Sequence, residues 1–457
     1  MRKSTIDMTQ GPILSNMIRF AVPIMLGGLL QMCFNAADLI VVGRFCGSQS
    51  VAAVGATGAV TSLIVNFFMG LALGGGVAVA NAVGAKDDQT VQKTVHTSMC
   101  AALVGGVILT VLGVALASSL LRLMGTPEDI LPLSTVYMQI HFAGAVPMLV
   151  YNYGAAILRA AGESKKPVYY LTVAGVLNVL LNVLFVTVFD MNVAGVSLAT
   201  ALSQTVSAAL VVLCMLKRED SCRLYPKKLR IHRAPFVKIL KIGIPSAVQG
   251  SMFSISNVII QSSFNSLGKI VMTAQAAGQN INSFMGVVIN SIASAVVNFC
   301  GQNMGARNYA RVKKIIYTGV IAGFVMGNVL GVATFFFGKP LLGMYITDSP
   351  EAIAIGMRRL MLMSLPYFTY GVNDAMSGAL RGIGKSMAAM VISILGICVY
   401  RVGWVATVFQ IPKFHTPDTL FISYPISWLL TFIIMFVWFL CSWDKVIKKE
   451  EAKYAKG

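Results

Sequence analysis

The sequence predicts an all-α membrane protein of twelve transmembrane helices, arranged as two six-helix bundles. Three observations predict it: few charged residues, twelve long apolar runs, and a repeat that relates the two halves of the chain. The chain has 457 residues, of which 56% are hydrophobic and only 12% charged, whereas a soluble domain carries about 25% charged residues. No stretch between the apolar runs is long enough for a sizeable soluble domain.

Each apolar run is long enough to cross a bilayer, which takes roughly 20 apolar residues. Charge clusters and Gly or Pro residues separate the runs. The predicted spans cover residues 14–42, 52–82, 94–118, 131–157, 168–188 and 193–216, and then 237–262, 271–301, 313–338, 353–379, 387–410 and 419–441. The first span contains Pro23, which removes one backbone hydrogen bond and predicts a kink.

Short motifs recur in the second half at a nearly constant offset. Four pairs of segments match: 84–93 with 305–314 at an offset of 221, 158–164 with 380–386 at 222, 126–128 with 349–351 at 223, and 22–23 with 244–245 at 222. Six spans separate equivalent positions, so both halves should have the same orientation in the membrane. The repeat predicts an N-terminal bundle (1–216), a cytoplasmic linker (217–236), a C-terminal bundle (237–443) and a cytoplasmic tail (444–457).

The formal net charge of +19 is explained by membrane topology. Of the 36 Lys and Arg residues, 28 fall in segments on one side of the spans and seven on the other. The seven are Arg44, Arg122, Lys269, Lys339, Arg358, Arg359 and Lys413, while Arg401 lies within a span. The positive-inside rule therefore places both termini in the cytoplasm of a multi-pass protein in the cytoplasmic (inner) membrane. Nucleic acid is not an expected partner.

Oxygen-bearing side chains in the N-terminal half are predicted to form a cation site. A charge at the bilayer centre costs roughly 2.5–3.5 kcal/mol on insertion scales, so an intramembrane acid is a functional candidate. Asp38 lies late in the outward-running first span. Asn178 and Asn182 share one face of the fifth span, and Thr200 lies about 10 Å below the outer start of the sixth. Asp38, Asn182 and Thr200 can therefore meet, with Asn178 one turn lower.

A carboxylate, two amide oxygens and a hydroxyl suit a hard cation such as Na⁺, and no other metal is expected. Alternatively, burial raises the proton affinity of Asp38 and the site exchanges H⁺. Two simpler interpretations remain open: Asp38 reaches water at the outer boundary, or the asparagines form only interhelical hydrogen bonds.

Asp374 is the second candidate for a coupling residue. It lies in the inward-running tenth span, two turns before Arg381, and its repeat equivalent is Asn152. The position is therefore polar in both halves but charged in only one. The alternative interpretation is an acid that is solvated near the inner mouth or paired with Arg381.

Composition and repeat predict a two-lobed secondary transporter, and the motifs add a family resemblance. They are the sequence NAADLIVVGRFCG at 35–47, the loops GAK at 84–86 and GAR at 305–307, and the paired LR-x-x-G-x-S loops. With these motifs the chain resembles bacterial transporters of the multidrug and toxic compound extrusion (MATE) family. The resemblance implies antiport, in which a small organic, often cationic compound leaves against Na⁺ or H⁺. It implies no cofactor beyond that ion, and we expect a monomer in the lipid bilayer.

The resemblance also bears on the candidate residues. In related transporters, an acid at the position of Asp38, an Asn at that of Asn178 and a hydroxyl residue at that of Thr200 line the cation site. Asn182 departs from this pattern, because many relatives have Asp there. Some relatives use an acid in the region of Asp374.

Two other functions compete with drug export. A lipid-linked saccharide flippase of the same superfamily should carry several inward-facing Arg or Lys residues for the pyrophosphate, and only Arg401 is mid-span. A membrane-embedded enzyme should carry a clustered His/Asp or Ser/His pair, but the four histidines are scattered along the chain. The sequence therefore predicts a transporter and not an enzyme.

The repeat makes a testable prediction about symmetry. We expect the two halves to superpose by a rotation of about 180° around the membrane normal, as measured in an experimental structure in a lipid environment. An inverted relation between the halves would contradict the parallel repeat.

Overall fold

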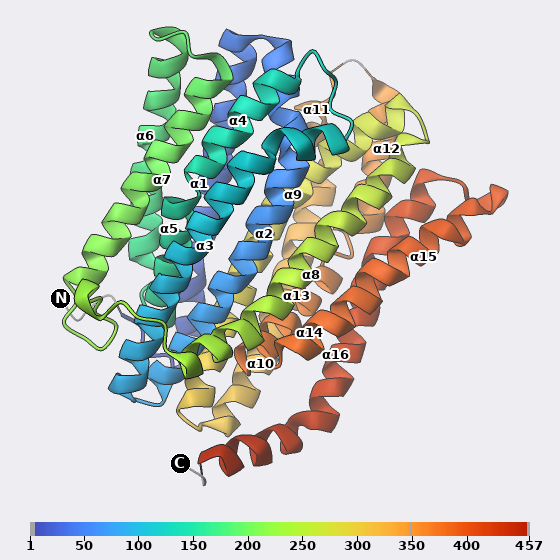
Figure 1. Cartoon of the computed structure of the whole chain (residues 1–457). Helices are drawn as coiled ribbons and strands as arrows, with labels where there is room; N and C mark the ends of the chain where they lie inside the picture. The colour runs from blue at the N-terminus through green and yellow to red at the C-terminus, as the bar shows by residue number, and fades with distance from the viewer. Residues whose placement is uncertain (1–4, 348, 455–457) are drawn as a thin grey trace. The chain divides into compact units, whose positions relative to one another are not determined.

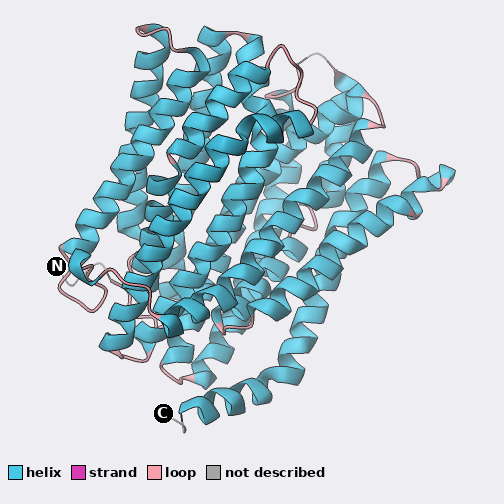
Figure 2. Ribbon diagram, viewed as in Figure 1, coloured by secondary structure: helices cyan, strands magenta, loops and turns pink. Residues whose placement is uncertain are grey.

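The regular structure of this protein is helical throughout the part that the computed structural model describes, residues 5–347 and 349–454 (Figures 1 and 2). The predicted all-α class is confirmed. Hydrocarbon offers no partner for backbone N–H and C=O groups, so apolar runs form helices that satisfy their own hydrogen bonds. Within the described residues, nine helices are long and apolar enough to cross a membrane, and the bent pair α4–α5 makes a tenth.

The first six predicted spans correspond to seven α-helices, because a 47° bend divides the fourth span into α4 and α5. The first span ends in a π-helical turn, η1. The bounds are α1 Ile13–Val41, η1 Val42–Cys46, α2 Ser48–Gly84, α3 Asp88–Leu123, α4 Leu131–Ala143, α5 Ala145–Ala160, α6 Lys165–Thr187 and α7 Asn192–Leu216.

The second half begins after the short 3₁₀ turn η2 (Pro226–Lys228) of the linker. Its helices are α8 Arg233–Asn265, α9 Lys269–Gly305, α10 Tyr309–Phe336, α11 Gly338–Gly343, α12 Pro350–Arg359, η3 Leu360–Ser364, α13 Phe368–Gly382, α14 Ser386–Ser393, η4 Ile394–Val399, α15 Tyr400–Ala406, η5 Val408–Gln410, η6 Pro412–Phe414 and α16 Pro417–Tyr454. Two of the predicted spans, α8 and the broken helix α12–η3–α13, are more polar than the rest. They complete the twelve spans, six in each half.

The chain packs into two compact units. The N-terminal unit contains Val22–Ser251 and the described residues before Met8, and the C-terminal unit contains Met8–Ala21 and the described residues from Met252 onward. Both helices that change unit carry an internal proline, Pro23 in α1 and Pro245 in α8. Because proline removes a backbone hydrogen bond inside a helix, these positions are where each helix bends most easily.

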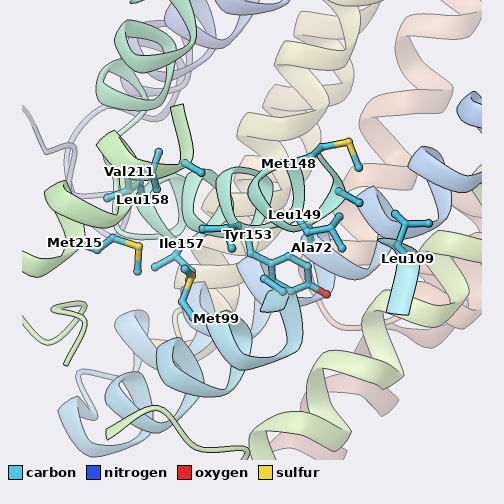
Figure 3. Close-up of a cluster of buried hydrophobic side chains, with 14 of the residues drawn as sticks. Ala72, Met99, Leu109, Met148, Leu149, Tyr153, Ile157, Leu158, Val211 and Met215 are labelled. Carbon is cyan, nitrogen blue, oxygen red and sulfur yellow. The ribbon is translucent and has the colours of Figure 1, made fainter. Parts of the chain in front are cut away.

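The core of the N-terminal unit is built around α5. Figure 3 shows Leu149, Tyr153 and Ile157 of this helix among side chains from α2, α3 and α7. Close approach depends on glycine, because a Cβ at Gly154 would lie 2.3 Å from the side chain of Val211 in α7. Small residues serve this purpose in membranes, where lipid supplies no hydrophobic force to drive helices together.

The C-terminal unit uses a row of glycines on α10. Gly319, Gly323, Gly327 and Gly331 recur every four residues and are all buried. A Cβ at Gly323 would lie 2.4 Å from the carbonyl oxygen of Gly371 in α13. The backbones of α10 and α13 therefore pack in direct contact.

Replacing Gly323 with Ala tests this contact. The added methyl group forces α10 away from α13, and we expect a loss of about 1–3 kcal/mol of stability, as for overpacked cores, measured by thermal unfolding. The control is Gly403→Ala in α15, where a Cβ meets nothing within 4 Å. Equal stability of the two variants would show that α10 and α13 can separate at no cost.

Candidate functional site

Three helices of the N-terminal unit bring the predicted cation ligands together. Asp38 lies near the end of α1, Asn178 and Asn182 lie on α6, and Thr200 lies on the first half of α7. All but Asn182 line one small pocket of about 40 Å³. A pocket of this size suits an ion or a few water molecules, and organic ligands generally occupy several hundred Å³.

A chain of hydrogen bonds links the four side chains. Asn182 Nδ2 donates to Asp38 Oδ1 and also to Asn178 Oδ1, the latter at 3.4 Å. Asn178 Nδ2 donates in turn to Thr200 Oγ1 at 3.3 Å. The structure therefore brings together the residues that helix depth predicts to meet. Asn178 links Asn182 to Thr200 in this row of hydrogen bonds.

One acceptor in this cluster lacks a donor. Asn182 is fully buried, and its Oδ1 atom accepts no hydrogen bond from any described residue. A buried amide oxygen without a donor is costly, and a bound cation or a proton on a neighbouring oxygen removes the cost. The cluster thus contains the kinds of oxygen atom that bind a cation. One of these atoms, Asn182 Oδ1, has no positive partner among the described residues.

The pocket continues past the predicted residues along α1 and α7. Gln31 and Asn35 lie below Asp38 on α1, and Gln31 Nε2 donates to Asn35 Oδ1 at 3.2 Å. Three residues of α7 complete its polar lining: Ser203, Gln204 and Ser207. None of these five was predicted from the sequence. The available signal was their helical spacing, since each lies three, four or seven residues from Asp38 or Thr200.

The apolar wall of the pocket depends on a glycine. Phe34 lines the pocket, and a Cβ at Gly175 of α6 would lie 1.8 Å from its ring. Only glycine at this position leaves room for the aromatic side chain.

Asp374, the second candidate, is paired within its own helix. Its Oδ1 lies 3.8 Å from Arg381 Nη2, seven residues further along α13. Its Oδ2 is buried and has no hydrogen-bond partner among the described residues. The structure therefore places Asp374 apart from the Asp38 cluster, in the C-terminal unit, beside its own counter-charge.

Two arginines differ from their expected surroundings. The charge count placed Arg359 with the outer loops, but this residue is fully buried in the C-terminal unit. It is the last residue of α12, and its guanidinium packs against α9, where it donates to Gln275 and Asn282. Arg401 lies within a predicted span and therefore needs a partner, but it does not pair with the acid Asp374. Instead its Nε donates to Ser427 Oγ at 2.8 Å and its guanidinium stacks on Tyr424.

Comparison with known families decides the identity of this fold. The family model MatE matches residues 23–184 and 245–404, which together exceed half of the chain. The chain belongs to the MatE family. The two matched stretches begin at Pro23 and Pro245, the positions that the repeat had paired at an offset of 222.

Individual relatives agree with this assignment. The MatE chain is 27% identical over 438 residues to the probable multidrug resistance protein YoeA of Bacillus subtilis, covering 94% of each chain. It is 30% identical over 396 residues to YpnP, another probable multidrug resistance protein of Bacillus subtilis, covering 86% of this chain and 88% of the relative.

Solved structures show the same fold. An outward-facing multidrug resistance MATE family transporter of the MOP superfamily superposes with a TM-score of 0.91 at 22% identity, covering 98% of this chain and 99% of that one. A MATE protein in a bent conformation gives a TM-score of 0.89 at 22% identity, covering 97% and 98%. The MatE family match and the relatives named for multidrug resistance identify this protein as a membrane transporter and not an enzyme.

The geometry of Asp374 predicts a mainly structural role, which a double-mutant cycle tests. Because Asp374 and Arg381 are largely buried partners, we expect Asp374→Asn and Arg381→Gln to destabilise by amounts that do not add, with a coupling energy of about 1 kcal/mol or more. The measurement is thermal unfolding of both single variants and the double variant. Additive losses would mean that the 3.8 Å pair contributes nothing.

Proposed function

We propose that this MatE transporter exports organic, often cationic compounds in exchange for Na⁺ or H⁺, with Asp38 as the coupling residue. The observation that carries the proposal is the hydrogen-bonded cluster of Asp38, Asn182, Asn178 and Thr200 beside a small polar pocket. The names of the relatives, which describe multidrug resistance and multidrug export, support the substrate class.

The charge of the pocket favours a monovalent ion. Asp38 is the one carboxylate among the pocket-lining residues, and the remaining polar lining is made of amides and hydroxyls. Binding one Na⁺ or one H⁺ leaves this region neutral, while a divalent cation would leave a positive charge in a low-dielectric surrounding. Asn182 contributes to this choice because it donates to Asp38 from beside the pocket without adding a second negative charge.

Either ion would change the same hydrogen bonds. A proton on Asp38 turns the carboxylate into a donor, which can turn toward an amide oxygen. A sodium ion draws the oxygens of Asp38, Asn178 and Thr200 toward itself and competes with the Asn182 donor. Both changes alter how α1, α6 and α7 are held together, and only the ion-bound form has neutral charge in the pocket.

Coupling does not require the ion and the substrate to touch. Each ligand shifts a transporter between inward-facing and outward-facing states by its different affinity for the two. One charge crossing a potential of 100 mV contributes about 2.3 kcal/mol, which is enough to bias such an equilibrium. Pro23 removes a backbone hydrogen bond within α1, which gives the Asp38 end of that helix freedom to move relative to its start.

The membrane placement belongs to the same proposal. With Arg359 removed from the outer set, 28 basic residues face six across the predicted spans, and both termini lie in the cytoplasm of a bacterial plasma membrane. We propose a monomer, since each candidate site is complete within one chain. The pyrophosphate of a lipid-linked saccharide would need several cationic groups lining a pocket, and the pocket around Asp38 has none.

Asp38→Asn is the decisive variant for this function. It keeps the size of the side chain and its hydrogen bonds but removes the charge, so it should fold normally and yet lose uphill export by at least about tenfold. The measurement uses liposomes with equal protein content, in which a Na⁺ gradient and a pH gradient are imposed separately. The control is Asp190→Asn, which removes an exposed carboxylate of the same unit at a left-handed position that Asn tolerates.

A second-site variant distinguishes charge from structure. Adding Asn182→Asp to Asp38→Asn returns a carboxylate to the cluster at its buried end, and we expect part of the gradient-driven export to return. Export by Asp38→Asn at the rate of the unmodified protein would move coupling away from this cluster.

A further inference from the structure

The C-terminal unit buries two arginines away from any carboxylate. Arg359 is fully buried and Arg401 is 4% exposed. Neither takes part in an ion pair among the described residues, whereas the neighbouring Arg358 pairs with Asp418. Burying a charge without a counter-charge is unfavourable, and such groups in membrane proteins face a cavity or a ligand by default.

Arg359 has its hydrogen bonds satisfied by neutral amides. Its Nε donates to Gln275 Oε1 at 2.7 Å and its Nη1 to Asn282 Oδ1 at 3.1 Å. Gly278 lies between them on α9 and makes room, since a Cβ there would come within 2.4 Å of Arg359 Nη1. These contacts fix the guanidinium in position but leave its positive charge uncompensated.

Arg401 has both an uncompensated charge and an unused donor. Its guanidinium lies 4.0 Å from the ring centre of Tyr424 and 5.3 Å from that of Trp428. Its Nε donates to Ser427, but the buried Nη2 has no hydrogen-bond partner among the described residues. The aromatic faces hold the plane of the guanidinium and leave one edge free to donate.

The two arginines act on one region. Asn282, which accepts from Arg359, also accepts at its carbonyl oxygen from Tyr367 Oη at 3.3 Å. The ring of Tyr367 lies 5.8 Å from the ring of Trp428, over which Arg401 stacks, so one group of side chains joins the two arginines. The acid that could neutralise them, Asp374, is already paired with Arg381 on α13. Among the described residues, the two positive charges of this region therefore lack a negative partner that can accept a hydrogen bond.

We propose that Arg401 Nη2 binds a small monovalent anion in the C-terminal unit, with Arg359 supplying a second positive charge. The ligand is a halide such as chloride or the carboxylate of a transported compound, since both carry one charge and accept from a guanidinium edge. The site lies in a different unit from Asp38 and does not depend on the coupling proposed there.

The test uses the full-length protein in nanodiscs at constant Na⁺ concentration and ionic strength. Methanesulfonate, which has no carboxylate and is a weaker hydrogen-bond acceptor, is replaced stepwise by chloride in one series and by acetate in another, and the thermal unfolding midpoint is followed. We expect a saturable rise in at least one series. A rise with chloride alone identifies a halide site, and a rise with acetate alone identifies a carboxylate site. No rise in either series would overturn the proposal.

Matched variants assign the effect to its residues. Arg401→Gln should weaken the apparent anion affinity by at least tenfold and Arg359→Gln by less, while Arg358→Gln, the exposed neighbour, should leave it unchanged. Asp38→Asn should also keep the response, which separates this site from the coupling site. An undiminished response in Arg401→Gln would place the anion elsewhere and contradict the proposal.

A fluorescence readout covers the case in which Arg401→Gln does not fold. Iodide bound at Arg401 lies against Trp428, so it should quench tryptophan emission saturably, and chloride should compete. Trp428→Phe keeps both arginines and should abolish the saturable part, although the chain has three other tryptophans. Saturable quenching that survives in Trp428→Phe would contradict a site at this position.

Discussion

Hydrocarbon cannot hydrogen-bond, and this constraint accounts for most of the structure. It forces the apolar runs into helices, which satisfy their own backbone groups. It also removes the hydrophobic drive between helices, so that close contact relies on glycine, as along the α10 row against α13. The same constraint makes each polar group within a span conspicuous. Asp38 with its amide partners and Arg401 with its aromatic partners stand out for this reason.

The polar clusters around Asp38 in one unit and Arg401 in the other carry opposite charges. In the N-terminal unit, one carboxylate is surrounded by amides and hydroxyls, and a buried amide oxygen of Asn182 has no donor. In the C-terminal unit, two guanidinium groups are surrounded by amides and aromatic rings, and Arg401 Nη2 has no acceptor. The halves therefore share a fold and a repeat but differ in the charge of the polar cluster that each contains.

Most of the fold and three of the eight polar residues that line the candidate pocket followed from sequence patterns. Hydropathy located the spans because length and apolarity are direct requirements of the bilayer. Helix rise and orientation then brought Asp38, Asn182 and Thr200 to one depth, and the structure links them by hydrogen bonds. Gln31 and Asn35 were missed because an uncharged polar residue costs little in a span, so composition alone does not mark it.

The buried arginines show a different limit. Arg358 and Arg359 are adjacent and chemically identical, yet one pairs with Asp418 at an exposed position and the other is buried against α9. The choice depends on helix phase before η3 and on the space that Gly278 leaves, about 80 residues away in sequence. No local pattern contains that information.

Infrared difference spectroscopy tests most directly whether Asp38 takes up the coupling ion. A carboxylic acid that loses its proton, or a carboxylate that binds Na⁺, changes its C=O stretching band. The purified protein is stepped from acidic to alkaline pH, and separately from K⁺ to Na⁺ medium. We expect a carboxyl band that responds to at least one of these steps, is lost in Asp38→Asn and is retained in Asp374→Asn. A response that persists unchanged in Asp38→Asn, or disappears in Asp374→Asn alone, would contradict it.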